Sequence, residues 1–301
     1  MDILEQLISL AQISGHLDIQ CRLQGSWYLR HEPKTACGIA HIVTQGSGYL
    51  QIDGQQQPHF VKSGDVIFFP RSIGHTLTDQ PNTTARKIIP QTGRNGAFIL
   101  KHCGETSADF SLFCARFEYE RQAELISNLP EYIFLHIDAQ HILTPIIQLL
   151  HNEAARPAMG ATLVTNALSV VLLVSILRAY LQQHNVTLSG TLNGWQDRRL
   201  QRLIQAILAH PEQDWSVERM STIANLSRAQ LMRVFKQQMA ISPHAFVHKI
   251  RLQNAALLLK RSNESILSIA LTSGFQSETH FGKAFKKYYG LTPGHYRKLK
   301  K

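Results

Sequence analysis

Hydrophobic positions follow different patterns in the two halves of the chain. Residues 26–118 contain short apolar runs, alternating or continuous, that are separated by turn residues, as in Gly48–Gly54 and Gly64–Pro70. Such runs predict β-strands, and their regular spacing predicts a small barrel or jelly roll. Further along, residues 139–155 and 161–183 are densely apolar and are predicted to be helices.

The last hundred residues contain one helical pattern twice. In the first copy, Ser216 is a predicted N-cap for 217–224, and Ser227 caps a second helix after the turn residue Asn225. In the second copy, Ser265 and Gly274 mark the corresponding cap and turn. Each copy therefore predicts a helix-turn-helix. The positions that recur at an offset of 50 are Leu231 and Phe281, Val234 and Ala284, Phe235 and Phe285, Lys236 and Lys286, Ile241 and Leu291, Ser242 and Thr292, Pro243 and Pro293, and Phe246 and Tyr296.

One uninterrupted helix is predicted to join the two copies. Ser242 followed by Pro243 is an N-cap with proline at the first helical position, and neither Gly nor Pro occurs from there to Arg261. At 1.5 Å per residue this helix is roughly 28 Å long. Two recognition helices held by such a rod can enter successive major grooves, which lie about 34 Å apart.

Basic residues are concentrated in the duplicated region. Residues 197–301 contain 18 Lys and Arg against 6 Asp and Glu, whereas residues 1–196 contain 13 and 15. The whole excess of +10 therefore comes from the duplicated region, which is the electrostatic pattern of a nucleic-acid binder.

The motifs of this region resemble a known family. Ile266–Ala270 leads into Ser273-Gly274-Phe275, and Phe281-x-x-x-Phe285-Lys286 is followed by Gly290–Arg297. With these motifs residues 197–301 resemble the DNA-binding domain of the AraC/XylS family of bacterial transcription regulators. The resemblance implies double-stranded promoter DNA and RNA polymerase as partners.

The resemblance also implies which side chains contact DNA. Arg233 can bond a guanine in a bidentate manner, Glu278 can accept from a cytosine amino group, and Met232 can contact a thymine methyl. Ala229 is smaller than the residues common at its position. The full set of predicted base contacts is Ala229, Met232, Arg233, Glu278, Thr279, His280 and Lys283. Predicted phosphate contacts, for which the alternative is a solvated surface charge, are Arg228, Lys236, Lys286, Lys287 and Arg297, with Lys298, Lys300 and Lys301.

The first half contains a candidate ligand or metal site. The stretch Gly64-x5-Pro70-x4-His75 resembles the second motif of the cupin fold, with Ser72 where cupins usually have glycine. His41 precedes Gly48 by seven residues, where metal-binding cupins carry a carboxylate. Two imidazoles are fewer than the three protein ligands typical of a catalytic metal. His41 and His75 are therefore candidates for binding a metal ion or small ligand in the cupin-like barrel, and a structural role for both is the alternative. A metal ion at this site is the one candidate cofactor.

All four cysteines also lie in the first half. Asp2 and Glu5 occupy the place of a basic signal-peptide start, so we expect a cytoplasmic protein with reduced thiols. In an oxidant-responsive subgroup of the family, the active pair maps onto Cys21 and Cys114. The alternative is that both thiols are buried as small apolar side chains.

The expected fold is α+β and multidomain. A cupin-like β-barrel sensor is expected over residues 1–135, a helical dimerisation segment over 136–184, a linker over 185–196, and an all-α domain with two helix-turn-helix motifs over 197–301. The apolar run 157–177 is interrupted by Thr and Ser, so we expect a helix packed against the barrel or against a second subunit rather than a membrane span. The family resemblance implies that this helix forms the contact of a homodimer. The expected function is an activator of efflux or stress-response genes, reading a bipartite site under control of a small-molecule, metal or oxidant effector. A cupin-type metalloprotein and a purely architectural DNA-binding protein are the alternatives.

Overall fold

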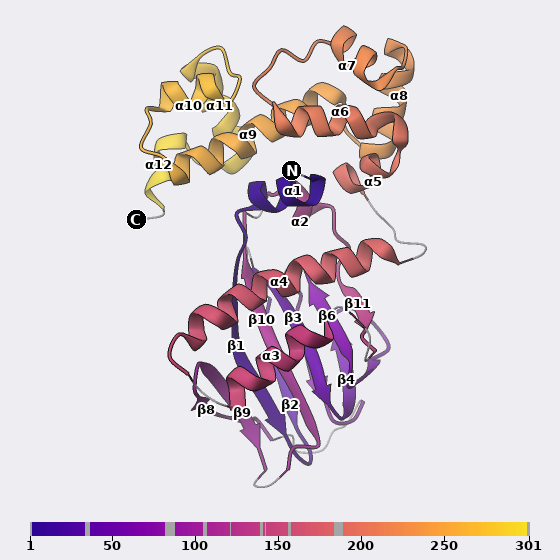
Figure 1. Cartoon of the computed structure of the whole chain (residues 1–301), viewed down its shortest axis with the longest axis vertical. Helices are drawn as coiled ribbons and strands as arrows, with labels where there is room; N and C mark the ends of the chain where they lie inside the picture. The colour runs from indigo at the N-terminus through magenta and orange to yellow at the C-terminus, as the bar shows by residue number, and fades with distance from the viewer. Residues whose placement is uncertain are drawn as a thin grey trace. The chain divides into compact units, whose positions relative to one another are not determined.

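The computed structural model describes residues 2–33, 37–81, 88–104, 107–120, 122–138, 141, 143–155, 158–183 and 189–299. The chain forms two compact units (Figure 1). The barrel unit consists of Ile13–Arg121 and Pro130–Val186, and the helical unit consists of Met1–Gln12, Gln122–Leu129 and Thr187–Lys301.

Two β-sheets make up the barrel unit. The larger sheet has the strand order β11-β6-β3-β10-β1-β9-β8, and the smaller has the order β2-β7-β4-β5. The strands are β1 (Ser14–Leu23), β2 (Tyr28–His31), β3 (Cys37–Gln45), β4 (Ser47–Ile52), β5 (His59–Lys62), β6 (Asp65–Phe69), β7 (His75–Thr78), β8 (Gln91–Asn95), β9 (Phe98–Cys103), β10 (Phe110–Glu118) and β11 (Ile133–His136). The apolar runs predicted as strands around Leu50 and Ile67 are thus β4 and β6.

Apolar side chains from both sheets form one core between them. Trp27 and Leu77 contribute from the side of the smaller sheet, and Val43, Ile67 and Leu112 from the larger. Each of these side chains is almost completely buried, so this core supplies the hydrophobic stabilisation of the unit. Strand β10 lies between β1 and β3 and is buried along nearly its whole length.

Helices α3 (Thr144–Ala155) and α4 (Ala161–Gln182) lie across one face of the larger sheet (Figure 1). A Cβ on Gly15 of β1 would lie 2.3 Å from the Ser169 hydroxyl of α4, so glycine permits this close approach. The predicted helical segment is therefore packed within the barrel unit, and its first helix begins at Thr144 rather than near residue 139.

By length and composition, α4 is a candidate membrane span, and among the described residues it is the one helix of this kind. Leu172, Leu173 and Ile176 of α4 are buried inside the unit. A core helix of a soluble protein has the same composition.

The helical unit contains both helix-turn-helix motifs. Its helices are α1 (Ile3–Ala11), α2 (Glu124–Ser127), α5 (Gly190–Gln196), α6 (Arg198–Ala209), α7 (Val217–Ala224), α8 (Arg228–Met239), α9 (Pro243–Arg261), α10 (Ile266–Thr272), α11 (Glu278–Tyr289) and α12 (Pro293–Lys298). The predicted caps are confirmed: Ser216, Ser227, Ser242 and Ser265 each accept a hydrogen bond from a backbone N–H of the first turn. Ser277 caps α11 in the same way.

The composition of the two units differs from the expected domains. Helices α1 and α2, expected in the sensor, belong to the helical unit. Residues 190–196, expected as linker, form α5, whose buried Leu192 and Thr191 pack within that unit. Gly and Asn in this stretch indicated a turn, but burial against neighbouring helices overrides that local preference. Residues 185–188, at the start of the expected linker, lie outside the described residues, as does residue 184 at the end of the expected dimerisation segment.

Candidate functional site

Helix α8 has a buried face and an exposed face that follow its periodicity. Leu231, Val234 and Phe235 are buried, as the apolar stripe predicted. A capping box between Ser227 and Gln230 begins the helix. The side chains expected to contact bases lie on the opposite, exposed side: Ala229, Met232 and Arg233.

Helix α11 repeats this arrangement. Phe281 and Phe285 are completely buried in the second core cluster. The predicted base-contact residues of this helix are exposed: Glu278, Thr279, His280 and Lys283. Neither set of predicted base-contact residues is therefore buried in a core. A hollow beside α11 is lined by His280, Lys283, Lys287 and Tyr288, together with His248 and Leu252 of α9.

The basic side chains expected at phosphates have two kinds of environment. Lys236, Lys286 and Lys287 are exposed. Arg228 is exposed but forms an ion pair with Glu218, at 2.7 Å. The Arg297 guanidinium is partly buried and donates to the Glu264 carbonyl oxygen at 2.6 Å, so one of its donors already serves the fold. Lys300 and Lys301 lie outside the described residues.

Helix α9 takes part in the cores of both helix-turn-helix motifs. Near its start, the Phe246 ring lies 5.8 Å from Phe235 of α8. Further along, Leu252, Ala256 and Leu259 pack in the cluster that contains Phe281. Since 19 residues form this helix without interruption, one rigid element supports both exposed faces.

Three histidines and one cysteine meet inside the barrel unit. His41 of β3 and Cys114 of β10 are directly opposite each other in the larger sheet, and His31 of β2 and His75 of β7 are opposite each other in the smaller sheet. The two cross-strand pairs face one another across the core. His41 Nε2 lies 2.7 Å from His75 Nε2, and His41 Nδ1 lies 3.2 Å from Cys114 Sγ.

The hydrogen bonds determine the proton positions in this histidine cluster. His75 Nδ1 lies 2.7 Å from the Ile73 carbonyl oxygen and must donate to it. In the neutral tautomer its Nε2 then accepts from His41 Nε2–H, and His41 Nδ1 accepts from the Cys114 thiol. Burial lowers the pKa of His75 from 6.5 to about 4 and holds the pKa of His41 well below its usual range. His41 and His75 are therefore neutral near pH 7.

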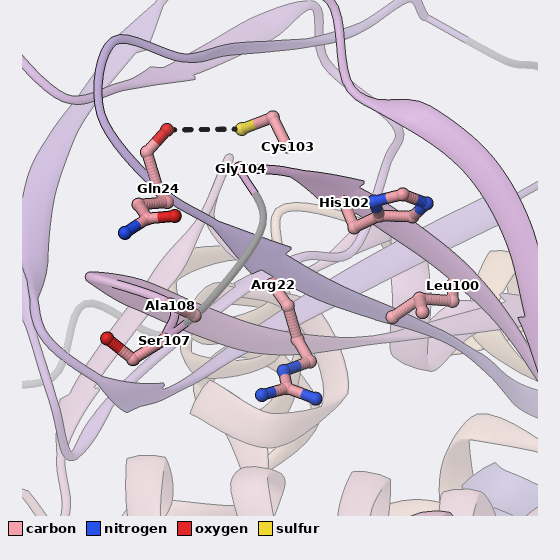
Figure 2. A pocket seen from close by; sticks show the side chains of 8 residues that line it. All are labelled: Arg22, Gln24, Leu100, His102, Cys103, Gly104, Ser107 and Ala108. Atoms are coloured by element: carbon pink, nitrogen blue, oxygen red, sulfur yellow. Dashed lines mark hydrogen bonds between the residues drawn. The ribbon is translucent and has the colours of Figure 1, made fainter.

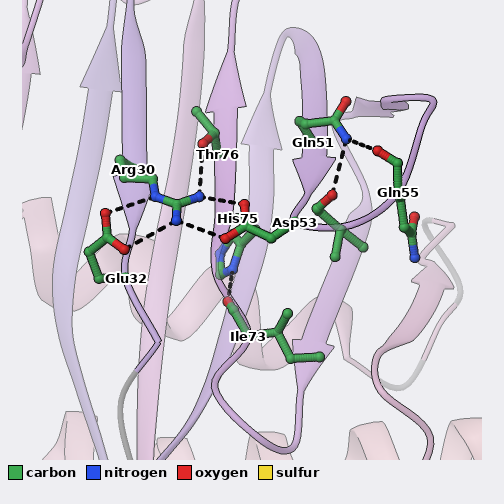
Figure 3. A network of polar contacts seen from close by, with 9 residues as sticks. Arg30, Glu32, Gln51, Asp53, Gln55, Ile73, His75 and Thr76 are labelled. Carbon is green, nitrogen blue, oxygen red and sulfur yellow. Dashed lines mark hydrogen bonds and ion pairs between the residues drawn. The ribbon is translucent and has the colours of Figure 1, made fainter.

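Strand pairing brought His31 and Cys114 into a cluster for which the sequence indicated only His41 and His75. His31 also stacks on His75, with ring centroids 4.9 Å apart and planes 10° apart. Its neighbour Arg30 forms ion pairs with Asp53 at 2.6 Å and Glu32 at 2.9 Å (Figure 3). Both nearby carboxylates thus share one guanidinium as their ion-pair partner.

The proposed redox partners Cys21 and Cys114 lie on adjacent strands, both completely buried. Cys21 is opposite Leu112, two residues from Cys114. The Cα atoms of such diagonal neighbours are about 7–8 Å apart. In a disulfide the two Cα atoms are usually about 4.4–6.8 Å apart. The register therefore does not place these two cysteines in bonding geometry.

Cys103 occupies a different part of the barrel unit. Its thiol donates to the Gln24 carbonyl oxygen at 3.5 Å and lines a hollow that also includes Arg22 and His102 (Figure 2). It has no part in the histidine cluster.

Comparison with known proteins identifies both parts of the chain. A family model described as Cupin matches residues 2–182, and one described as Helix-turn-helix domain matches residues 220–299. The HTH-type transcriptional regulator MtrA of Neisseria gonorrhoeae is 52% identical over 299 residues, which cover 99% of this chain and 98% of that protein. The chain belongs to the AraC family of transcription regulators.

Two further relatives cover the full length. An uncharacterised HTH-type regulator of Haemophilus influenzae is 40% identical, over 99% of both chains. The RCS-specific activator RclR of Escherichia coli is 28% identical, over 99% of this chain and 97% of that protein. This AraC-family protein is accordingly a DNA-binding regulator and not an enzyme, and its N-terminal part is cupin-like. The cupin resemblance of the first half and the helix-turn-helix prediction for the second are both confirmed.

Proposed function

We propose that this regulator activates transcription by binding a bipartite promoter site, with α8 and α11 in successive major grooves. The single observation that carries the proposal is the joint packing of both helices on α9, with their predicted base-contact sides exposed. A helix in the major groove reads bases through such exposed side chains.

The basic residues divide into two roles. Arg233 and Lys283 contact base edges, while Lys236, Lys286 and Lys287 contact phosphates and set the orientation of the protein. The remaining base contacts come from Ala229, Met232, Glu278, Thr279 and His280. Arg228 contacts phosphate after leaving Glu218, and Arg297 contributes its donors that face away from Glu264.

Activation in the cytoplasm, with RNA polymerase as partner, is proposed from the relatives. RclR is named as a transcriptional activator, and MtrA, which resembles this chain more strongly, is an HTH-type regulator. Efflux or stress-response genes are the proposed targets.

A homodimer is proposed to form through α4. Leu163 and Val171 of this helix are 76% and 49% exposed, and lie on one side of it with Ala167 and Val174. Residues four apart share a helix face, so these side chains form an apolar stripe. A second copy of α4 would remove this stripe from water.

The barrel unit is proposed to control DNA binding. Strand β1 directly follows α1, and β10 is joined to α2 by residues 119–123. A change in the barrel core can therefore alter the packing of α1 and α2 in the helical unit. A coupling free energy of only about 1–3 kcal/mol between the barrel and DNA binding changes promoter occupancy severalfold or more.

Selection from a random pool of duplex DNA tests the proposal. Full-length protein should enrich sequences with two conserved elements about 10–10.5 base pairs apart, centre to centre. The logarithm of the affinity should also fall linearly with the logarithm of the salt concentration. Enrichment of a single continuous element, or an affinity independent of salt, would contradict the bipartite reading.

A further inference from the structure

The histidine cluster has the composition of a metal site. We propose that His31, His41 and Cys114 bind one cuprous ion, and that the ion is an input to the regulator; the second part rests on the proposed function. Side-chain ligand atoms of these three residues lie within 4.8 Å of one another. Imidazole nitrogen and thiolate sulfur are the ligands that soft and borderline transition ions prefer.

The spacing of the ligand atoms suits a single ion. With three ligands spread evenly around one ion, bonds of about 2.0 Å to nitrogen and about 2.3 Å to sulfur place the ligand atoms about 3.5–3.7 Å apart. His41 Nδ1 and Cys114 Sγ are already 3.2 Å apart, and the widest pair of ligand atoms, within 4.8 Å, needs to close by about 1 Å. The strand register already aligns Cys114 with His41, so the strands can keep their pairing when the ion binds.

His75 acts as a positioning residue. Its Nδ1–H donates to the Ile73 carbonyl oxygen, which leaves its Nε2 to accept from His41 Nε2–H. His41 Nδ1 is then the coordinating atom, and it is the nitrogen that faces Cys114. Metal-binding histidines commonly have their second nitrogen fixed in this way.

Charge favours a monovalent ion. Cys114 contributes one negative charge as a thiolate and the imidazoles contribute none, so Cu⁺ gives a neutral site whereas Zn²⁺ leaves one uncompensated positive charge. His41 and Cys114 are completely buried, and an uncompensated buried charge is strongly unfavourable. Asp53 and Glu32, the carboxylates that pair with Arg30, are 48% and 69% exposed, so solvent screens their charge from the site.

Binding exchanges a proton for the ion. The Cys114 S–H bond breaks, a copper–sulfur bond forms, and the proton leaves to solvent. His41 Nδ1 stops accepting from the thiol and donates its lone pair to copper. No oxidation or reduction takes place when the ion enters as Cu⁺.

The test uses full-length protein under anaerobic, reducing conditions. Cuprous ion is titrated against a coloured Cu⁺ chelator, and bound copper is counted. We expect one tightly bound ion per chain, and X-ray absorption should show one sulfur and two nitrogen ligands. Cys114→Ser and His31→Ala should each weaken binding at least tenfold, and His75→Gln about 10–100-fold. Cys103→Ser is the matched control, since this buried thiol lies outside the cluster, and it should bind copper like the wild type.

Several results would overturn the assignment. These are unchanged binding by Cys114→Ser, absence of sulfur from the absorption spectrum of the wild type, or saturation by Zn²⁺ with no binding of Cu⁺. The spectrum of the wild type decides the question even if a variant fails to fold.

DNA binding by the same preparations separates this inference from the proposed function. Selection of two-element sites by the copper-free protein supports the proposed function whatever the copper result. Stoichiometric copper binding that leaves DNA affinity and promoter activity unchanged would show that the ion is not an input. Failure to select two-element sites would instead contradict the proposed function. The copper titration and the absorption spectrum would still decide whether the protein binds copper.

Discussion

Glu124 of α2 forms an ion pair with Lys249 of α9. The Glu124 carboxylate is 2% exposed, and it also accepts from the Thr191 hydroxyl at 2.7 Å. Since only residues 119–123 separate β10 from α2, the strand that carries Cys114 leads directly into a segment anchored on the helix that supports both DNA-reading motifs.

Replacing the anchoring carboxylate should loosen this attachment. We expect Glu124→Gln to lower the free energy of unfolding by about 1–3 kcal/mol, because Lys249 and Thr191 lose a charged partner. Urea unfolding followed by tryptophan fluorescence measures the change. Glu131→Gln, at an exposed carboxylate, is the control, and an equal effect of both variants would mean that the buried ion pair adds nothing.

Arg233 and Lys236 should differ in how they affect DNA binding. Arg233→Ala should cost about 1–3 kcal/mol on the selected site and relax the preference at one base pair, whereas Lys236→Ala should weaken all sequences alike and reduce the salt slope by about 1. Affinities on a panel of single-base variants distinguish the two. A uniform loss for Arg233→Ala would reassign it to a phosphate.

The aromatic core of the second motif should be sensitive to truncation. Phe285 is completely buried, and its ring lies 4.5 Å from Tyr289 and 5.2 Å from Tyr296. Phe285→Ala should therefore cost about 3–5 kcal/mol of stability. Lys286→Ala, one residue along on the exposed side, should leave the melting temperature nearly unchanged. A normal melting temperature for Phe285→Ala would contradict the observed packing.

Acid should destabilise the helical unit through His248. Burial, with positive charge from His280 and Arg251, lowers the pKa of His248 below 6.5. Its contribution is fully present above pH 6.5 and is lost as pH falls through the lower pKa of the folded state, because the unfolded chain binds the proton more readily. We expect His248→Gln to flatten the fall in unfolding free energy between pH 7.5 and 5. The ring is only partly buried, which keeps this effect well below the limit of about 1.4 kcal/mol per pH unit for one proton. If the unfolding free energies of the variant and the wild type fell in parallel over this pH range, the assignment to His248 would be wrong.

A charge in the apolar stripe of α4 should prevent dimerisation. We expect Val171→Glu to shift the protein to monomer in sedimentation velocity, because an isolated carboxylate at an apolar interface is costly to desolvate. Gln182→Glu, at an exposed position near the end of the same helix, should sediment like the wild type. A wild-type protein that is monomeric at micromolar concentration would remove the proposed interface.

The helices of the helical unit could be predicted because their signals are local. Ser216, Ser227, Ser242 and Ser265 each cap a helix that begins at the next residue. A cap bonds to a backbone group two or three residues away, and an apolar stripe repeats within one turn. The sequence therefore determined where these helices begin and which sides face solvent.

Only the tertiary structure decided what lies inside the barrel unit. His41 and Cys114 are 73 residues apart in the chain, and a register shift of one residue would turn either side chain to the other face of the sheet. No local pattern includes His31, and none predicts that α2 joins the helical unit. Strand register and the burial of α2 depend on contacts between distant segments, which exist only once the chain has folded.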